Sequence, residues 1–129
     1  MRKYVSILSL ALAATIVAAG FTLAQDAKDK KSDYEISDVM KKGMKGGLKD
    51  KVMKGGADAA EKLEFLDMMI SLKAYKPKKG DADSWKALTD ATLMAAAKAA
   101  VGRDDAAADL KAATNCAKCH KEHKPPTEE

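Results

Sequence analysis

Four stretches with helical spacing, separated by short breakers, constrain the fold of this chain more than any other feature. Apolar residues recur three or four positions apart in each stretch, and no stretch alternates as a half-buried strand would. The predicted helices run from about Tyr34 to Lys54, from about Ala57 to Tyr75, from Asp83 or Ser84 to Gly102, and from Asp104 to about Glu122. Helices of this length joined by short loops predict an all-α fold, an antiparallel four-helix bundle.

The composition agrees with a helical protein and excludes several other classes. Aromatic residues make up 5% of the chain and hydrophobic residues 47%, so the core must consist mainly of Ala, Leu, Met, Ile and Val. The 8 glycines and 3 prolines are too few for a turn-rich β domain. The net charge of +4 is too mild for a nucleic-acid-binding protein, which needs a strongly basic, one-sided patch.

Two of the predicted helices have a recognisable apolar stripe that is expected to face the core. The spacing in each stripe follows the three-four pattern of one helix face. The stripe of the second helix is Ala59, Leu63, Leu66, Met69 or Ile70, and Ala74, and that of the third is Trp85, Leu88, Thr92, Ala95 and Ala99.

The first predicted helix is poorly suited to its assignment because it contains three glycines, Gly43, Gly46 and Gly47. Each glycine costs roughly 1 kcal/mol relative to alanine in a helix interior. One interpretation is a kinked or partly frayed helix. The other is that a flat, bulky group lies against the helix where the Cβ atoms are missing.

The N-terminus has the layout of a secretory signal peptide. A basic start is followed by the apolar run Val5–Ala19, and Thr22-Leu23-Ala24 supplies small residues at a cleavage site. An uncleaved membrane anchor is the alternative, since Val5–Ala24 approaches a spanning length. We expect cleavage near Ala24, a periplasmic mature protein and no stable membrane insertion after cleavage. The predicted organisation is a signal peptide 1–24, a flexible lead-in 25–33 and a four-helix-bundle domain 34–129.

The motif that carries chemistry is Cys116-Ala117-Lys118-Cys119-His120, a C-x-x-C-H sequence of the kind that attaches c-type haem. Two thiols three residues apart on a helical turn can each add to a haem vinyl group. The imidazole that follows the second thiol is then presented to the iron. The motif predicts one covalent haem c, held by Cys116 and Cys119, with His120 as proximal iron ligand.

Three other interpretations of the cysteines are weaker. A thioredoxin-like C-x-x-C would follow a strand, and no strand is predicted. A zinc site formed by Cys116, Cys119, His120 and His123 would lack the intervening loop that lets a chain wrap around a tetrahedral ion. A disulfide would close only a tiny loop and constrain the unfolded chain little. His123 itself is expected to be a solvated surface histidine.

The haem motif on the last helix, near the C-terminus, resembles the class II c-type cytochromes, which comprise cytochrome c-prime and its low-spin, methionine-ligated relatives. A looser similarity lies at Val39-Met40-Lys41 and the glycines that follow. The resemblance implies a four-helix bundle with haem attached to the fourth helix and its opposite face covered by the first. It also places Met40 at the distal ligand position of the low-spin members.

Two departures separate the chain from the gas-binding cytochrome c-prime subgroup. His123-Lys124 stands where that subgroup commonly has a Tyr-Arg pair, and Ile36 stands where it commonly has an arginine. Neither departure touches the residues of the haem motif. The low-spin branch is therefore the better match.

Met40 and Met44 compete for the distal position because residues one turn apart share a helix face. Gly47 lies seven residues after Met40 and points almost the same way, and Gly43 lies to one side of it. A porphyrin centred under Met40 would spread beneath these glycines, whereas one centred under Met44 would meet the Met40 side chain. Simple core filling is the other role open to either methionine.

Taken together, these patterns predict an electron carrier with His/Met-ligated haem that docks with a redox partner protein. The alternative is a five-coordinate protein that binds nitric oxide or carbon monoxide. No enzyme is expected, because the sequence has no nucleophile-base pair, second metal cluster or phosphate loop. The lysines that could steer an acidic partner, or simply form a solvated face, are Lys41, Lys42, Lys45, Lys49, Lys51 and Lys54. The sequence leaves monomer and homodimer both open.

Overall fold

The computed structural model describes residues 34–126. The predicted signal peptide, the alternative membrane anchor and the lead-in 25–33 therefore lie outside the described residues, as do the last three positions. Within residues 34–126, no helix combines the length and the apolar character that crossing a membrane requires.

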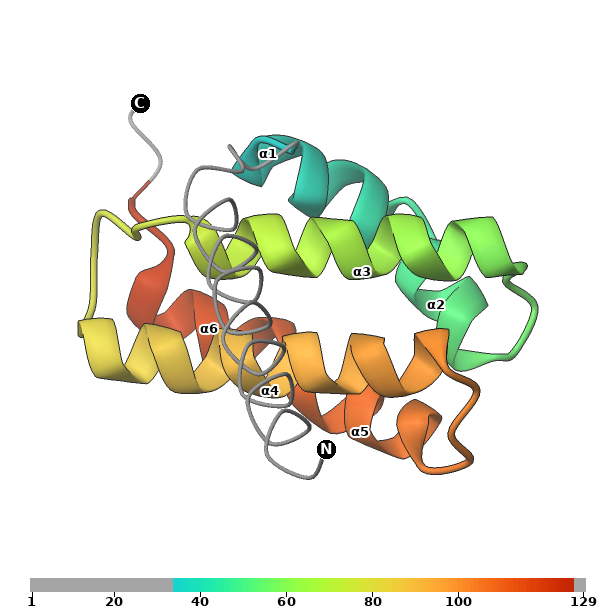
Figure 1. Cartoon of the computed structure of the whole chain (residues 1–129). Helices are drawn as coiled ribbons and strands as arrows, with labels where there is room; N and C mark the ends of the chain where they lie inside the picture. Colours follow the sequence, from blue (N-terminus) through green and yellow to red (C-terminus); the bar gives the residue numbers. More distant parts are fainter. Residues whose placement is uncertain (1–33, 127–129) are drawn as a thin grey trace, which may run out of the picture. The chain divides into compact units, whose positions relative to one another are not determined.

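The described residues form an all-α fold without strands, which confirms the all-α part of the predicted fold class (Figure 1). The elements are α1 (Ile36–Asp38), the π-helix η1 (Val39–Lys45), α2 (Leu48–Met53), α3 (Ala59–Ala74), α4 (Ala82–Ala100), α5 (Ala106–Ala113) and α6 (Cys116–His123). The two long helices, α3 and α4, pack side by side, and α5 packs against α4. The short N-terminal elements pack against α3 and each other. This arrangement is compatible with a helical bundle.

The first predicted helix is not continuous, so the prediction of one helix from about Tyr34 to Lys54 is wrong. A π-helix, in which hydrogen bonds span five residues rather than four, occupies its middle. The chain then turns at Gly46 and Gly47 before α2 begins. Gly47 has a φ of 87°, in the left-handed region that glycine adopts without steric cost. Of the two interpretations of these glycines, the kinked helix agrees with the structure.

The fourth predicted helix is also divided, and the division determines where the cysteines lie. Thr114 ends α5, and its hydroxyl donates to the carbonyl of Leu110 (2.5 Å). The side chain of Asn115 accepts a hydrogen bond from the backbone N–H of Lys118 (3.3 Å) and so caps α6. A new helix therefore begins at Cys116, and the C-x-x-C-H motif occupies its first turn.

The core is built mainly by the face of α3 that carries its bulkiest side chains, together with small residues of α4. The predicted stripe of the second helix is wrong at Ala59, Leu63 and Ala74, which are exposed. Of its two alternatives, Met69 is buried and Ile70 is 48% exposed. Apolar residues occur around most of α3, and the face with its phenylalanine removes more apolar area from water. The stripe of the third helix is confirmed at Thr92, Ala95 and Ala99. The buried apolar residues are Val39, Val52, Ala57, Phe65, Met68, Met69, Leu72, Ala95, Ala96, Ala99, Ala106 and Leu110.

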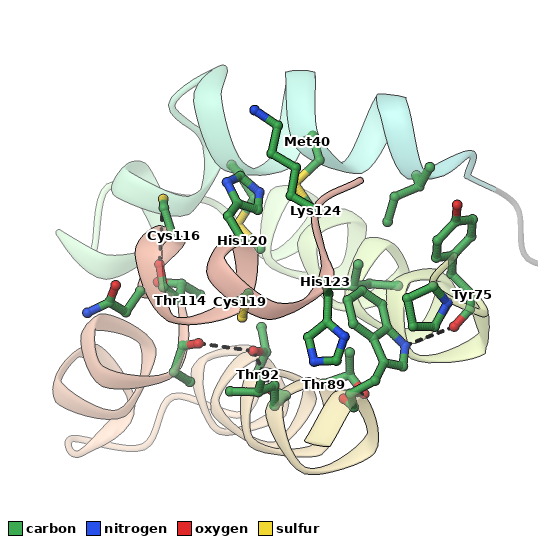
Figure 2. Close-up of a pocket in the computed structure, with 18 of the residues that line it drawn as sticks. Met40, Tyr75, Thr89, Thr92, Thr114, Cys116, Cys119, His120, His123 and Lys124 are labelled. Carbon is green, nitrogen blue, oxygen red and sulfur yellow. Dashed lines mark hydrogen bonds between the residues drawn. The ribbon is translucent and has the colours of Figure 1, made fainter. Parts of the chain in front are cut away.

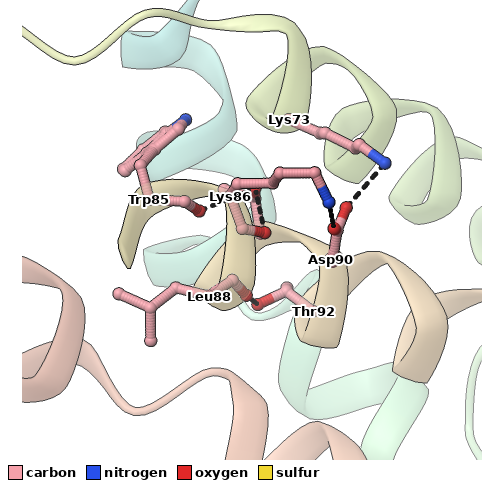
Figure 3. A network of polar contacts seen from close by, with 7 residues as sticks. Lys73, Trp85, Lys86, Leu88, Asp90 and Thr92 are labelled. Atoms are coloured by element: carbon pink, nitrogen blue, oxygen red, sulfur yellow. Dashed lines mark hydrogen bonds and ion pairs between the residues drawn. The ribbon is translucent and has the colours of Figure 1, made fainter. Parts of the chain in front are cut away.

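A carboxylate on α4 links the two long helices (Figure 3). Asp90 forms an ion pair with Lys73 of α3 (Nζ–Oδ1 2.6 Å) and another with Lys86 of its own helix (Nζ–Oδ2 2.6 Å). The hydrogen bonds from Lys73 and then Lys86 hold the pKa of Asp90 below its ordinary value. The folded state is therefore favoured by ionisation of this carboxyl group.

Asp90→Asn is expected to lower the melting temperature at neutral pH by no more than a few degrees, because the ion pairs are solvent-accessible. A carboxyl whose folded pKa is depressed stabilises the protein above its unfolded pKa of about 3.9, and this contribution is lost as pH falls through the folded pKa. The difference between variant and wild type should therefore shrink in acid. Thermal melts of Asp90→Asn and of Asp67→Asn, an exposed carboxylate of α3, test this. Equal pH dependence of the two variants would contradict it.

Candidate functional site

A cavity of about 540 Å³ lies between the first segments of the chain, the connection after α3, and helices α4 and α6 (Figure 2). Its lining is largely apolar and includes Ile36, Leu72, Trp85 and Leu88. A second, more open hollow of about 420 Å³ is lined by the polar connection Gly102–Asp105 and contains none of the predicted site residues. The large cavity is therefore the candidate site.

The two cysteines and the histidine of the predicted haem attachment motif line this cavity. Cys116 and Cys119 lie on the first turn of α6, and both thiols are free. Cys116 and His120 are exposed, whereas Cys119 is half-buried. The thiols and the imidazole are thus accessible from the space that a bound group would occupy.

Burial raises the pKa of the Cys119 thiol, and the nearby Lys118 ammonium only partly opposes this effect. A cysteine that works in thiol–disulfide exchange instead has a depressed pKa, because the thiolate is the nucleophile. The described residues also contain no strand to precede a thioredoxin-like motif. The surroundings of Cys119 therefore do not favour a redox-active dithiol.

Both candidate distal ligands also line the cavity. Met40 and Met44 lie four residues apart on η1, and each is half-buried. In Figure 2, Met40 extends from η1 toward the side of the cavity that carries His120. The structure thus brings together the C-x-x-C-H motif and both methionines, which are at least 72 positions apart in the sequence.

The glycine argument that favoured Met40 over Met44 is wrong. Gly43 is buried against α3, where an added Cβ would lie 3.0 Å from the Met68 sulfur. Gly47 lies beyond the end of η1 in the left-handed turn. The predicted directions assumed α-helical geometry, whereas a π-helix turns by a different angle per residue. Both methionines remain candidates on the geometry of the cavity.

His123 is buried, so the prediction of a solvated surface histidine is wrong. Only 4% of the residue is exposed. Its Nδ1 lies 3.1 Å from the carbonyl oxygen of Lys79, and its Nε2 lies 3.1 Å from the Ser84 hydroxyl. Its ring contacts the Trp85 indole edge-to-face, with centroids 5.1 Å apart. These partners come from a distant connection and from α4, and no local sequence pattern signals them.

The alternative zinc site is not assembled. Within residues 34–126, no three or more histidine, cysteine or acidic side chains gather in an arrangement that could hold a metal ion. The two ring nitrogens of His123 are instead engaged by Lys79 and Ser84.

Lysines surround the cavity, although they differ from the set expected from the sequence. Lys45 lines it from the predicted set, joined by Lys78 and Lys124. Two others of that set pair with acids nearby: Lys51 with Glu61, and Lys49 with Asp50 (3.7 Å). The positive charge at the cavity is thus contributed by three separate segments.

Comparisons with known proteins returned no matching family model, no matching curated protein and no matching solved structure. The candidate site therefore depends on the residues and geometry of this chain alone.

Proposed function

We propose that this protein is a periplasmic c-type cytochrome that carries single electrons through one haem covalently attached to Cys116 and Cys119. The observation that carries the proposal is a single, largely apolar cavity lined by both cysteines and the histidine of the C-x-x-C-H motif and by two methionines. The packed helices support the finer proposal of an antiparallel four-helix bundle similar to the class II cytochromes.

The residues that line the cavity fit a haem. Its volume of about 540 Å³ is within the range of roughly 300–1,000 Å³ found for cofactor pockets. In the proposal, Cys116 and Cys119 form the two thioethers and His120 is the proximal ligand. Met40 is the favoured distal ligand on family position, with Met44 as its competitor.

When bound, the haem supplies the one-electron chemistry, and the chain controls its surroundings. Cys116 and Cys119 would fix the orientation of the group, and the imidazole of His120 would bind one face. A methionine ligand, Met40 in this proposal, would tend to raise the reduction potential of the haem. The apolar lining limits water access, which also tunes the potential. This set of roles supports an electron carrier rather than an enzyme.

A positively charged surface around the cavity suits an acidic redox partner protein. Lys45, Lys78 and Lys124 line the cavity from three segments of the chain. Opposite charge on a partner would speed its diffusional encounter, and the effect would weaken with salt. Electron exchange would then take place near the end of the protein where the cysteines and His120 are accessible.

The proposal predicts that the mature protein carries one haem that cannot be extracted. After periplasmic expression in a host competent in haem attachment, acid-acetone treatment should leave the colour with the polypeptide. Intact mass should equal a chain starting near Gln25 plus one haem. A Cys116→Ala, Cys119→Ala protein from the same host is the control. Colourless wild-type protein would contradict the proposed function.

A further inference from the structure

His123 occupies a socket made by residues from two other parts of the chain. We call Lys79, Gly80, Ser84 and Trp85 the His123 socket. Gly80 has a φ of 89°, and an added Cβ there would lie 2.4 Å from the His123 Nδ1. The space that a side chain at position 80 would fill is therefore taken by the imidazole ring.

Both nitrogens of the ring are used. A carbonyl oxygen can only accept, so Nδ1 donates its N–H to Lys79. Nε2 lies 3.1 Å from the Ser84 hydroxyl oxygen, and that hydroxyl donates a hydrogen bond to the Glu122 carboxylate (2.5 Å). A buried ring with a polar partner at each nitrogen has one preferred orientation, because rotation would separate both nitrogens from these partners.

His123 and Tyr75 lie toward one end of the candidate haem cavity (Figure 2), and Trp85 of the socket also lines it. The Trp85 indole N–H donates to the carbonyl oxygen of Tyr75 (2.8 Å), and the two rings meet edge-to-face at 6.2 Å. Tyr75, Trp85 and His123 all line the cavity. They join the end of α3, the start of α4 and the end of α6 into one wall.

The contact between His123 and its socket matters for α6 because this helix is short and buries no other residue. It spans Cys116–His123, and His123 is its one buried residue. The helix packs mainly against α4. Its C-terminal end is thus held by the His123 socket, and its first residue, Cys116, is joined to α5 by Thr114 and Asn115 alone.

We infer that His123 is a positioning residue that anchors the C-terminal end of α6 and thereby holds His120, almost one turn earlier, at its angle to the cavity. The inference rests on the proposed function, in which His120 binds haem iron. Groups that orient a metal-ligating histidine influence the metal, so the socket should affect ligand exchange and reduction potential. The thioethers would keep the haem on the chain even when the socket is broken.

The test compares two glycine substitutions in the haem-loaded protein. Gly80→Ala and Gly102→Ala share a positive φ, 89° and 74°, so both strain the backbone. Only at Gly80 does the new Cβ overlap His123, since nothing lies within 4 Å of the corresponding atom at Gly102. The difference between the two variants therefore reports the overlap of the new Cβ with the His123 ring and with the Glu122 carbonyl oxygen, 2.8 Å away, and removal of the ring separates the two.

We expect imidazole to bind the ferric haem of Gly80→Ala at least about tenfold faster than that of Gly102→Ala, because local opening of α6 becomes easier. The reduction potential of Gly80→Ala should also shift, whereas Gly102→Ala should keep the wild-type potential. In a His123→Ala background the ring is gone, so the difference between the two alanine substitutions should become much smaller; what remains would come from the Glu122 carbonyl oxygen, 2.8 Å from the Cβ added at Gly80. Ser84→Ala, which removes one partner of the ring, should give a smaller change in the same direction.

Equal imidazole rates and potentials for Gly80→Ala and Gly102→Ala would overturn the inference. Wild-type behaviour of His123→Ala would overturn it as well. Both results would leave the proposed function intact, because the covalent haem is measured separately by mass. If Gly80→Ala does not accumulate, Ser84→Ala and His123→Gln decide, since each removes contacts of the socket without adding bulk, and wild-type imidazole rates and potentials in both would overturn the inference. Wild-type protein without haem would overturn the inference together with the proposed function.

Discussion

Replacing both attachment cysteines, Cys116→Ala with Cys119→Ala, is expected to abolish cooperative unfolding or to lower the melting temperature sharply. A group that binds only the native state stabilises that state, and covalent attachment makes this binding effectively permanent. Without the haem, the largely apolar lining of a cavity of about 540 Å³ would be left in contact with water, which is unfavourable in a domain of only about 5–15 kcal/mol stability.

The experiment is thermal unfolding followed by far-ultraviolet circular dichroism, with dye binding to detect exposed apolar surface. Cys119→Ala alone is the matched control, because one thioether can still hold the haem in the cavity. We expect this single variant to unfold cooperatively at an intermediate temperature. The prediction fails if the double variant unfolds at the wild-type temperature with the same cooperativity.

Met40→Ala is expected to convert the ferric haem from low spin to high spin and to open a carbon monoxide site on the ferrous haem. Removing the proposed methionine ligand would leave one iron coordination position without a protein donor. Met44→Ala should leave the ferric haem low-spin. Optical spectra of the oxidised and reduced proteins, with and without carbon monoxide, provide the measurement.

The two methionine variants control for each other. Both side chains are half-buried on η1, both line the same cavity, and both changes remove the same atoms. Any loss of packing is therefore similar, and only loss of the ligand should change the spin state. The opposite pattern would assign the distal position to Met44. A wild-type ferric haem that is already high-spin would instead favour the gas-binding alternative.

The helical class and the composition of the candidate site were predictable from local patterns. Residues three and four apart share a helix face whatever surrounds the helix, so the spacing of apolar residues predicted an all-α protein. The same rule placed Cys116 and Cys119 on one helical turn, and the structure has them on the first turn of α6. Proximity in sequence was sufficient for these features.

Contacts between distant segments decided the rest. Whether α3 buries Phe65 or Leu63 depends on the helices packed against it, because its own sequence is apolar on more than one side. Gly43 faces the core rather than the cavity because the π-helix alters the direction of its residues. His123 is buried because Lys79 and Ser84 meet it from 44 and 39 positions away. Sequence spacing describes a helix by itself, whereas burial depends on which elements the chain brings against it.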